Sequence, residues 1–286
     1  MNLLHALWRS PRARVGLLLV LGFVLMAVVG PLVVQDPDAF ASRPLQPPSA
    51  AHWLGTNGQG QDVLAQTVVG ARTTLVVALI TGSLVVVVGS VIGGLAGFLG
   101  GRADDALSLL INVSLLLPGL PLMVVLAAWL PAGPASMTAV LVLTGWAWHA
   151  RVLRSQTLTL RQRDFVAAAR VSGEGTLRIL VVEVLPNMGG LLASSFVGAT
   201  VYAIGAQVGL EFLGLGDLGV VSWGTNLYWA SNDQALLTGS WWTFIPTGVC
   251  VALVGFGLTL VNFGLDEITN PRLKHPQRVG PTPVRR

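Results

Sequence analysis

The chain has 286 residues, of which 53% are hydrophobic and only 10% are charged. Soluble domains carry about 25% charged residues, so this composition excludes a water-soluble globular protein. The formal net charge is +4, and the single cysteine, Cys250, excludes a disulfide within the chain.

The apolar residues come in long blocks that show neither helical nor strand alternation. A block crosses the hydrocarbon core as a helix when it has roughly 20 mostly apolar residues. Six blocks qualify, of which the fourth is the shortest: residues 15–34, 74–99, 106–130, 134–150, 188–212 and 242–265. Backbone groups in lipid must pair within their own segment, so these blocks are helices. The prediction is an all-α integral membrane protein with six transmembrane helices.

Positive charge is distributed very unevenly over this six-span layout. Of the 17 lysines and arginines, all except Arg43 and Arg72 fall on one side. Short cytoplasmic loops retain Lys and Arg, so that side is predicted to be the cytoplasm, with both termini on it. No basic helix or aromatic–basic surface accompanies the charge, so nucleic-acid binding is not expected.

The blocks also divide the chain into segments. These are a cytoplasmic leader (1–14), the first span (15–34), an outer segment (35–73), a core of five spans (74–273) and a basic, Pro-rich cytoplasmic tail (274–286). Within the outer segment, residues 61–72 are expected to form a short helix at the membrane interface. Pro118 and Pro121 should kink the third span, and Pro246 the sixth.

Four glycines recur at intervals of four residues toward the end of the second span. They are Gly89, Gly93, Gly97 and Gly101. This spacing places them on one helix face, where missing side chains let another backbone approach closely. Tight packing within the chain is the favoured reading, and a contact with a partner subunit is the alternative.

Signals of catalysis are missing from the sequence. It holds no Gly-x-x-x-x-Gly-Lys-Ser/Thr loop, so the chain is not expected to bind ATP in that way. The histidines His5, His52, His149 and His275 are scattered without metal-ligand spacing. We therefore predict no catalytic residue, no metal site and no cofactor in this chain.

Polar residues inside the spans are few. Gln207 is the best mid-span candidate for a translocation pathway, and Glu211 lies at the outer end of the fifth span. Intramembrane ionisable residues often mark such a pathway. A satisfied hydrogen bond between helices is an equally good reading for both.

Residues 151–187 form the longest inner connection and the most informative stretch. Residues 164–171 read as a short helix, Ser-Gly-Glu-Gly at 172–175 as a turn, and residues 176–184 as a second short helix. The hairpin 164–187 is too polar to span a membrane, and its alanine face is small enough to fit a groove on another protein. The alternative is an amphipathic helix held on anionic lipid by arginines.

This stretch resembles the EAA coupling motif of ATP-binding cassette (ABC) importer permeases. That motif reads Glu-Ala-Ala, three residues, Gly, and later Ile-x-Leu-Pro. The positions that match are Ala168, Ala169, Gly173, Val184, Leu185 and Pro186. Ala167 stands where the family has its glutamate.

A second resemblance lies in the outer segment. Residues 52–62 resemble the signature His-Trp-Leu-Gly-Thr-Asp-x-x-Gly-Arg-Asp of the second permease in dipeptide, oligopeptide and nickel importers. Its matching residues are His52, Trp53, Leu54, Gly55, Thr56 and Asp62, whereas Asn57 and Gln61 replace the usual Asp and Arg. Residues 211–216, 222–225, 241–246 and 270–273 resemble later segments of the same family, so the matches run in order along the chain.

The resemblance implies a type I ABC importer permease fold in a prokaryotic cytoplasmic membrane. It implies one half of a translocation pathway, shared with a homologous first permease, and an external substrate-binding protein that delivers the solute. Two ATPase subunits, or one fused ATPase, would hold ATP and Mg and receive the hairpin. The residues implied in that coupling are Asp164, Phe165, Ala167, Ala168, Ala169, Gly173, Leu185 and Pro186.

The resemblance favours di- or oligopeptides as substrates, with nickel chelates or oligosaccharides as the alternative. Two other classes of function stay open from the residues themselves. One is a secondary transporter or channel that acts alone, against which the missing proton relay argues. The other is a membrane receptor or scaffold with a docking loop and no pathway.

Overall fold

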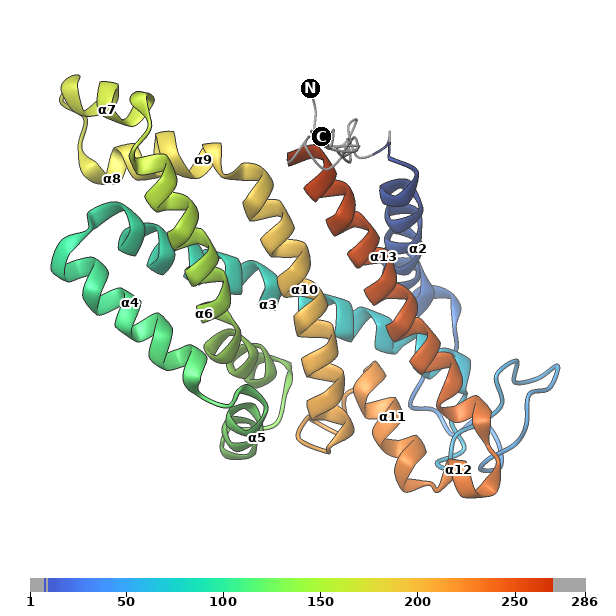
Figure 1. Cartoon of the computed structure of the whole chain (residues 1–286). Coiled ribbons are helices and arrows are strands. Elements are labelled where there is room, and N and C mark those ends of the chain that lie inside the picture. Colours follow the sequence, from blue (N-terminus) through green and yellow to red (C-terminus); the bar gives the residue numbers. More distant parts are fainter. Residues whose placement is uncertain (1–7, 9, 270–286) are drawn as a thin grey trace, which may run out of the picture.

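The computed structural model describes residues 8 and 10–269, and the regular elements within them are helices (Figure 1). In this part of the chain four helical stretches are long and apolar enough to cross a membrane: α2 (Pro11–Val33), α3 (Val63–Leu99), α10 (Gly189–Phe212) and Trp241–Glu267, which includes most of α13 (Ile245–Thr269). The predicted all-α, multi-span fold is confirmed. The number six is approximate, because the other two predicted spans differ from simple apolar helices.

The third predicted span is two helices, α4 (Gly101–Leu116) and α5 (Gly119–Trp129), which meet at an angle of 88°. The expectation of one kinked helix is therefore wrong. Pro118 disfavours the helical conformation for the residue before it, and Leu117 is accordingly extended, with ψ of 134°. Pro121 lies in the first turn of α5, where its missing N–H breaks no helical bond.

The fourth predicted span continues far beyond its apolar part. Helix α6 runs from Pro134 to Arg161, whereas the apolar block ends at residue 150. Hydropathy marks where lipid contact ends, and a helix need not end there. The final turns of α6 are polar, and they carry the hairpin.

Helix α3 is one continuous rod of 37 residues. The expected separate helix over residues 61–72 is thus wrong, and the boundary between residues 73 and 74 falls inside α3. At 1.5 Å per residue the rod is about 55 Å long. That length exceeds the hydrocarbon core of about 30 Å, so α3 crosses obliquely and passes behind α6 and α10 (Figure 1).

The glycine face of α3 packs against α6, as the within-chain reading expected. A side chain at Gly93 would collide with the carbonyl oxygen of Ala150, and one at Gly89 would come within 3.1 Å of the Ala150 nitrogen. A side chain at Gly97 would lie 2.7 Å from the Arg154 carbonyl oxygen. Gly101 does not belong to this face, because it begins α4 with a positive φ of 56° and has no neighbour within 4 Å.

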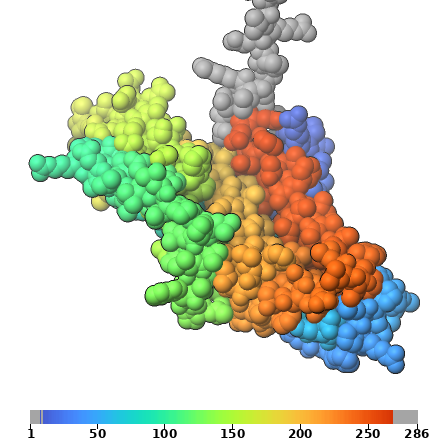
Figure 2. All heavy atoms as spheres, turned by 60° about the horizontal axis from the view of Figure 1, so that its bottom comes forward, coloured from blue at the N-terminus to red at the C-terminus, as the bar shows by residue number. Residues whose placement is uncertain are grey.

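The molecule has two distinct ends. The hairpin end carries α7 (Asp164–Val171), α8 (Thr176–Arg178), the start of α2 and the end of α13 (Figure 1). The loop end carries residues 34–62, α11 (Trp223–Asn232) and α12 (Ala235–Thr238). Seen from the loop end, residues 35–62 lie beside α11 and α12, and α4 and α5 form a ridge along the opposite edge (Figure 2).

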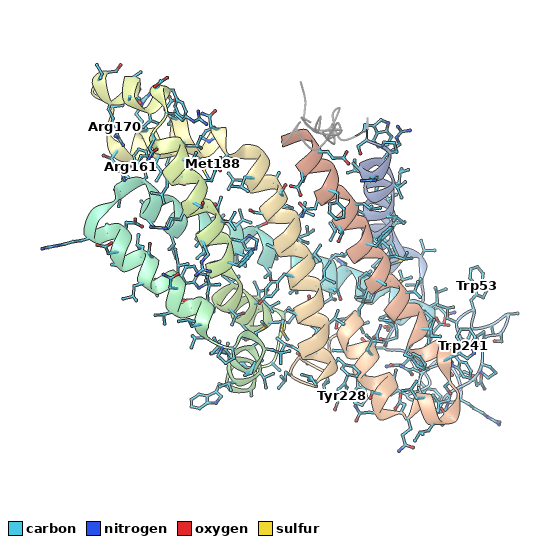
Figure 3. All side chains as sticks on the ribbon, viewed as in Figure 1. Trp53, Arg161, Arg170, Met188, Tyr228 and Trp241 are labelled. Carbon is cyan, nitrogen blue, oxygen red and sulfur yellow. The ribbon has the colours of Figure 1, made fainter. Side chains whose placement is uncertain are left out.

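Aromatic and basic side chains separate between these ends. Arg161 and Arg170 lie at the hairpin end, and Trp53, Tyr228 and Trp241 lie at the loop end (Figure 3). Aromatic side chains with one polar group favour the boundary between lipid and water. The segregation agrees with a protein that crosses a membrane between its two ends.

The α3–α6 contact can be tested with a matched pair of glycines. Gly93→Ala is expected to lower the free energy of unfolding by about 1–3 kcal/mol, because the methyl group overlaps the Ala150 carbonyl. Gly22→Ala on α2 adds the same group where no neighbour lies within 4 Å, so it should be neutral or slightly stabilising. Thermal unfolding in detergent measures both. Equal midpoints for the two variants would contradict the close contact.

Candidate functional site

The hairpin is anchored to the rest of the chain by a buried apolar face. Val166 of α7 and Ile179, Leu180 and Val184 of the second arm are buried in one cluster. Phe98 at the end of α3 and Leu153 of α6 belong to the same cluster. Each buried side chain of this kind contributes about 1.5–3 kcal/mol when removed from water. The hairpin is therefore packed firmly against α3 and α6 and is not a loose loop.

The turn of the hairpin requires a glycine for a physical reason. Gly173 has a positive φ of 81° directly after α7. Its N–H donates to the Arg170 carbonyl at 3.0 Å, and the N–H of Glu174 donates to the Ala169 carbonyl at 3.1 Å. These two bonds form a Schellman motif, which ends a helix and favours glycine at this position.

The predicted coupling residues divide between two faces of the hairpin. Asp164, Ala167, Ala168, Gly173 and Pro186 are exposed. The other three, Phe165, Ala169 and Leu185, pack against the buried cluster. The exposed set thus leaves mostly small side chains on the surface of the hairpin, and the second set fixes the hairpin to its own chain.

Sequence reasoning missed two groups of hairpin residues. The buried anchors Val166, Ile179, Leu180 and Val184 were missed, although their apolar spacing in two short helices was a visible signal. The apolar tip was missed too, where Val171 is 90% exposed and Leu177 is 63% exposed. Exposed apolar side chains at the end of a protein that lies outside its spans mark an interaction surface.

Pro186 determines the shape of the second arm. The predicted helix over residues 176–184 is α-helical only over α8, and Ile179–Val184 form a π-helix (η1). A short turn, α9 (Leu185–Asn187), then leads into α10. A proline ring clashes with the carbonyl four residues earlier in an α-helix. The wider π turn accommodates it, and the Leu185 N–H bonds to Leu180 five residues back.

The outer loop is fastened to the start of α3 by Asp62. Its Oδ1 accepts from the Ala65 N–H at 2.9 Å and caps the helix. Its Oδ2 lies 2.9 Å from His52 Nδ1, and both side chains are buried. Two residues of the outer signature therefore position the loop on α3.

Thr56 holds the centre of the same loop. Its Oγ1 donates to the Arg43 carbonyl at 2.7 Å and accepts from the Gln46 N–H at 2.9 Å. Its carbonyl accepts from the indole N–H of Trp242 at 3.1 Å. Gly55 has a positive φ of 70° and lies between the Gln46 carbonyl and the ring of Trp242. A side chain at this position would collide with both of them.

The two other signature residues differ from this buried set. Leu54 is half-buried, and Trp53 is 74% exposed and points away from the helices (Figure 3). An exposed indole at the loop end suits the membrane interface or a protein partner. The residues of the outer signature thus mainly fix the conformation of the loop, and one of them, Trp53, faces outward.

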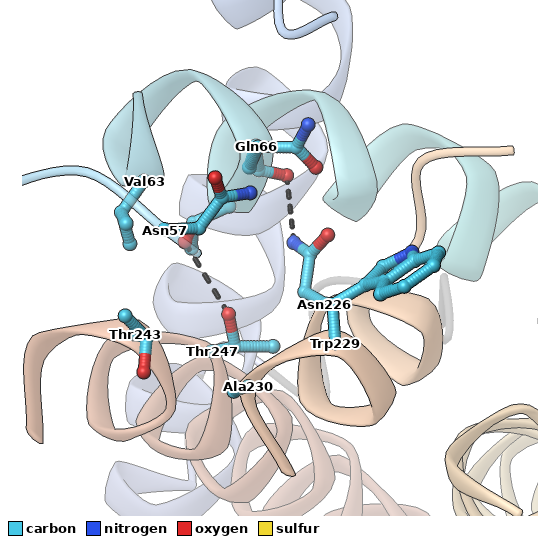
Figure 4. Close-up of a pocket in the computed structure, with 9 residues that line it drawn as sticks. Asn57, Val63, Gln66, Asn226, Trp229, Ala230, Thr243 and Thr247 are labelled. Atoms are coloured by element: carbon cyan, nitrogen blue, oxygen red, sulfur yellow. Dashed lines mark hydrogen bonds between the residues drawn. The ribbon is translucent and has the colours of Figure 1, made fainter. Parts of the chain in front are cut away.

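Helices α3, α11 and α13 meet around a small cavity beneath this loop, which both polar and apolar side chains line (Figure 4). Asn226 Nδ2 donates to the Gln66 carbonyl at 3.0 Å across it. Thr67 and Thr247 share a hydrogen bond of 3.3 Å on another wall, and Asn57 of the outer loop also lines it. These bonds tie the loop end together from three separate parts of the chain.

The segment 222–225 locks α11 to α3. Ser222 and Thr225 form a reciprocal capping box at the start of α11. Trp223 is completely buried, its backbone N–H donates to Thr74 Oγ1 at 3.1 Å, and its indole N–H donates to the Thr67 carbonyl at 2.9 Å. A tryptophan buried with its N–H satisfied contributes packing and orientation together.

Gln207 and Glu211 lie inside the chain. Glu211 Oε1 accepts from Gln207 Nε2 at 2.9 Å, and its Oε2 accepts from Ser222 Oγ at 2.6 Å. A side chain at Gly224 would collide with Glu211. The reading as a satisfied hydrogen bond between helices therefore describes Glu211, which joins α10 to the start of α11. Gln207 bonds within α10, and its buried Oε1 has no hydrogen-bond partner among the described residues. A pathway role stays a prediction for both residues.

Two departures from the outer signature are paired in space. Asn57 Nδ2 donates to Gln61 Oε1 at 2.9 Å, so a neutral amide pair occupies the positions of the usual Asp and Arg. The neighbouring Gly58 N–H donates to Asp233 Oδ2 at 3.0 Å. Burial raises the pKa of Asp233 above its usual value, and this N–H bond opposes the shift.

A multi-span helical protein with a seated, exposed hairpin at one end has the architecture of a transport permease subunit. The family of binding-protein-dependent transport system inner membrane components matches residues 89–275, which is more than half of the chain. The chain therefore belongs to this family, as its motifs predicted.

Similar proteins are permeases of peptide transport systems. The chain is 32% identical over 273 residues to the dipeptide transport system permease protein DppC of Bacillus subtilis, covering 93% of this chain and 83% of the relative. It is 31% identical over 268 residues to the oligopeptide permease OppC of the same organism, covering 92% and 86%. The OppC protein of Mycobacterium tuberculosis is 31% identical over 264 residues, covering 91% and 90%.

The paired departures in the outer loop give a double-mutant cycle. Asn57→Asp alone is expected to lower the free energy of unfolding by about 0.5–1.5 kcal/mol, because the bond to Gln61 is lost. Adding Gln61→Arg should recover that loss through an Asp–Arg pair. Thermal unfolding of the two single variants and the double variant measures the coupling. Strictly additive effects would show that the two positions are independent.

Proposed function

We propose that this chain is the transmembrane permease subunit of an ABC importer for di- or oligopeptides and forms half of its translocation pathway. The observation that carries the proposal is the hairpin: a buried apolar face seats it on α3 and α6, and a small-residue face is exposed. The names of the relatives support peptides as the substrate class. Nickel chelates or oligosaccharides are the alternative substrates of the same role.

The exposed face of the hairpin is proposed to dock in a groove on a cytoplasmic ATPase. Ala167 and Ala168 let the two backbones approach closely, and the apolar tip at Val171 and Leu177 adds buried area at the contact. Ala167 removes the carboxylate that the family carries, so small size and apolar contact supply the fit. ATP and Mg belong to two ATPase subunits or one fused ATPase.

The coupling motion follows from how the hairpin is connected. It joins α6 directly to α10, so a pull on it moves both helices. ATP binding closes the ATPase pair, draws this hairpin toward that of a homologous first permease and opens the pathway outward. An external binding protein delivers the substrate to the loop end.

The orientation follows from charge. In the predicted layout the arginines of the hairpin side include Arg151, Arg154, Arg161, Arg163 and Arg170, whereas Arg43 and Arg72 are the two predicted on the outer side. The hairpin end is therefore proposed to face the cytoplasm of a prokaryotic cell, together with both termini. The predicted tail 274–286 and the match at 270–273 lie outside the described residues.

The docking proposal is tested by adding the same side chain at two exposed helical positions. Ala168→Arg lies on the proposed docking face, and Gln156→Arg lies on α6 outside it. In a reconstituted complex, Ala168→Arg is expected to lower ATP-driven uptake at least tenfold and to weaken co-purification of the ATPase. Gln156→Arg should leave both unchanged.

Gly173→Arg extends this test to the turn. Its side chain meets no neighbour within 4 Å, so membrane insertion should persist although the positive φ adds strain of about 1–2 kcal/mol. Uptake is expected to be abolished. Normal ATP-driven uptake by both Ala168→Arg and Gly173→Arg would disprove the coupling role.

The substrate class is tested by competition. Uptake of a labelled dipeptide by the complete complex is expected to fall when an excess of unlabelled di- or oligopeptide is added. Nickel chelates and oligosaccharides should not compete. Competition by either of them, without competition by peptides, would replace the peptide assignment.

A further inference from the structure

Helix α4 is loosely attached to the rest of the chain. Among its 16 residues only Ile111 is buried, in a cluster with Trp146, Ala147 and Ala150 of α6. Helix α5, which follows the 88° bend, has no fully buried residue. Its partly buried side chains, among them Met123 and Leu126, pack against a cluster that includes Val140 and Leu141 of α6. Helix α4 therefore depends on a few specific contacts for its position.

The polar contacts of α4 are directed to α6. Arg154 Nε donates to Asp104 Oδ1 at 2.6 Å, and its Nη2 donates to Oδ2 at 2.8 Å. Ser108 Oγ donates to the same carboxylate at 2.8 Å, and Arg151 Nη2 donates to Asn112 Oδ1 at 2.8 Å. Positions 104, 108 and 112 recur every four residues, so they form one row along α4 facing α6.

The ion pair between Asp104 and Arg154 has a geometry that resists movement of α4 relative to α6. Two parallel N–H···O bonds join the guanidinium and the carboxylate, which fixes orientation as well as distance. The side chains are 31% and 17% exposed, so water screens the pair less than it screens a surface pair. Removing one partner would leave the other charge partly buried and unpaired.

The part of α6 that holds α4 also supports the hairpin. Leu153, beside Arg154, lies in the buried hairpin cluster, and Thr157 Oγ1 contacts the sulfur of Met188 at 3.7 Å. Arg161, the last residue of α6, lies against Gly100 at the turn between α3 and α4. This stretch of α6 therefore touches the hairpin on one side and α4 on the other.

We propose that the Asp104–Arg154 pair, with Arg151–Asn112 beside it, is the link through which hairpin motion reaches α4 and α5. The inference rests on the proposed coupling function of the hairpin. Asp104 and Arg154 act as positioning residues: they hold α4 to α6, so that the bent pair moves with the hairpin. Without the link, α6 and α10 move and the α4–α5 pair lags behind.

The test compares transport with ATP hydrolysis in the same reconstituted complex of permeases, ATPases and binding protein. Asp104→Asn and Arg154→Gln are expected to keep at least half of the wild-type hydrolysis rate while uptake per ATP falls at least tenfold. The exchange Asp104→Arg with Arg154→Asp should recover at least half of the lost ratio. A merely structural role would lower assembly and hydrolysis together and leave the ratio unchanged.

A matched control is available at the same end of the molecule. Glu267 lies 3.6 Å from Arg12 and accepts from Ser10 at 3.1 Å, which joins α13 to the start of α2 and not to α4. Glu267→Gln makes the same carboxylate-to-amide change and should keep the ratio of uptake to hydrolysis. An unchanged ratio in both Asp104→Asn and Arg154→Gln would overturn the proposal.

A second measurement leaves the ion pair intact, so it does not depend on the variants folding. Cys250 is first replaced by Ala, and spin labels are then attached at two pairs of exposed positions. One pair is Leu109 on α4 with Ser155 on α6, and the other is Val171 on the hairpin with Phe256 on α13. Between the nucleotide-free and ATP-trapped states, the α4–α6 distance should stay constant while the hairpin–α13 distance changes. A change in both distances overturns the link alone. If both distances stay constant, the hairpin does not move, and this result contradicts the proposed coupling function as well.

Discussion

The close approach of α3 and α6 is the constraint on which the rest of the structure depends. In lipid, helices gain little from burying apolar side chains against each other, so close backbone contact supplies much of their association. Gly89, Gly93 and Gly97 permit that contact because a side chain at any of them would meet α6. Since α3 continues over 37 residues, the same rod bears the Asp62 cap at one end and Phe98, under the hairpin, at the other. The loop end and the hairpin seat are thus positioned by one helix.

The hairpin combines two requirements that usually conflict in a short segment. It has a fixed shape, which Val166, Ile179 and Val184 provide by burial, and it has an exposed face, which Ala167 and Ala168 line. The Schellman turn at Gly173 and the π-helix before Pro186 supply the bends between these faces. Both bends are formed by backbone hydrogen bonds. The outward-facing side chains are therefore not needed to shape the hairpin and can be small.

The sequence predicted features that depend on composition and spacing. Long apolar blocks identified the membrane class, the repeat of Gly89, Gly93 and Gly97 identified a packing face, and the motif at 167–186 identified the hairpin and its family. It failed where a helix ends for reasons other than hydropathy. The start of α3 is set by the Asp62 cap and not by the onset of apolar residues. Helix α6 continues to Arg161, and its polar end bonds to α4 through Arg154 and packs against the hairpin through Leu153 and Leu160. Such tertiary contacts leave no periodic trace in one sequence. The bonding of Glu211 to Ser222, across the loop to α11, could not be read from spacing for the same reason.

Different contacts hold the helices together at the two ends of the molecule. At the loop end, the indoles of Trp223 and Trp242 donate to backbone carbonyls of Thr67 and Thr56, which belong to a buried helix and a tight loop. Both indoles are buried, so either bond breaks only if a large side chain leaves the core or the backbone is displaced. At the hairpin end, α4 and α6 are joined by side chains, of which Asp104 and Arg154 are charged and matched in shape. Side-chain pairs of this kind hold two helices in one orientation while leaving their backbones free to move as a unit. The buried indoles therefore fix α11 to α3 and the outer loop to the start of the last span, whereas the Asp104–Arg154 pair joins α4 to α6 so that the two helices can move as one body.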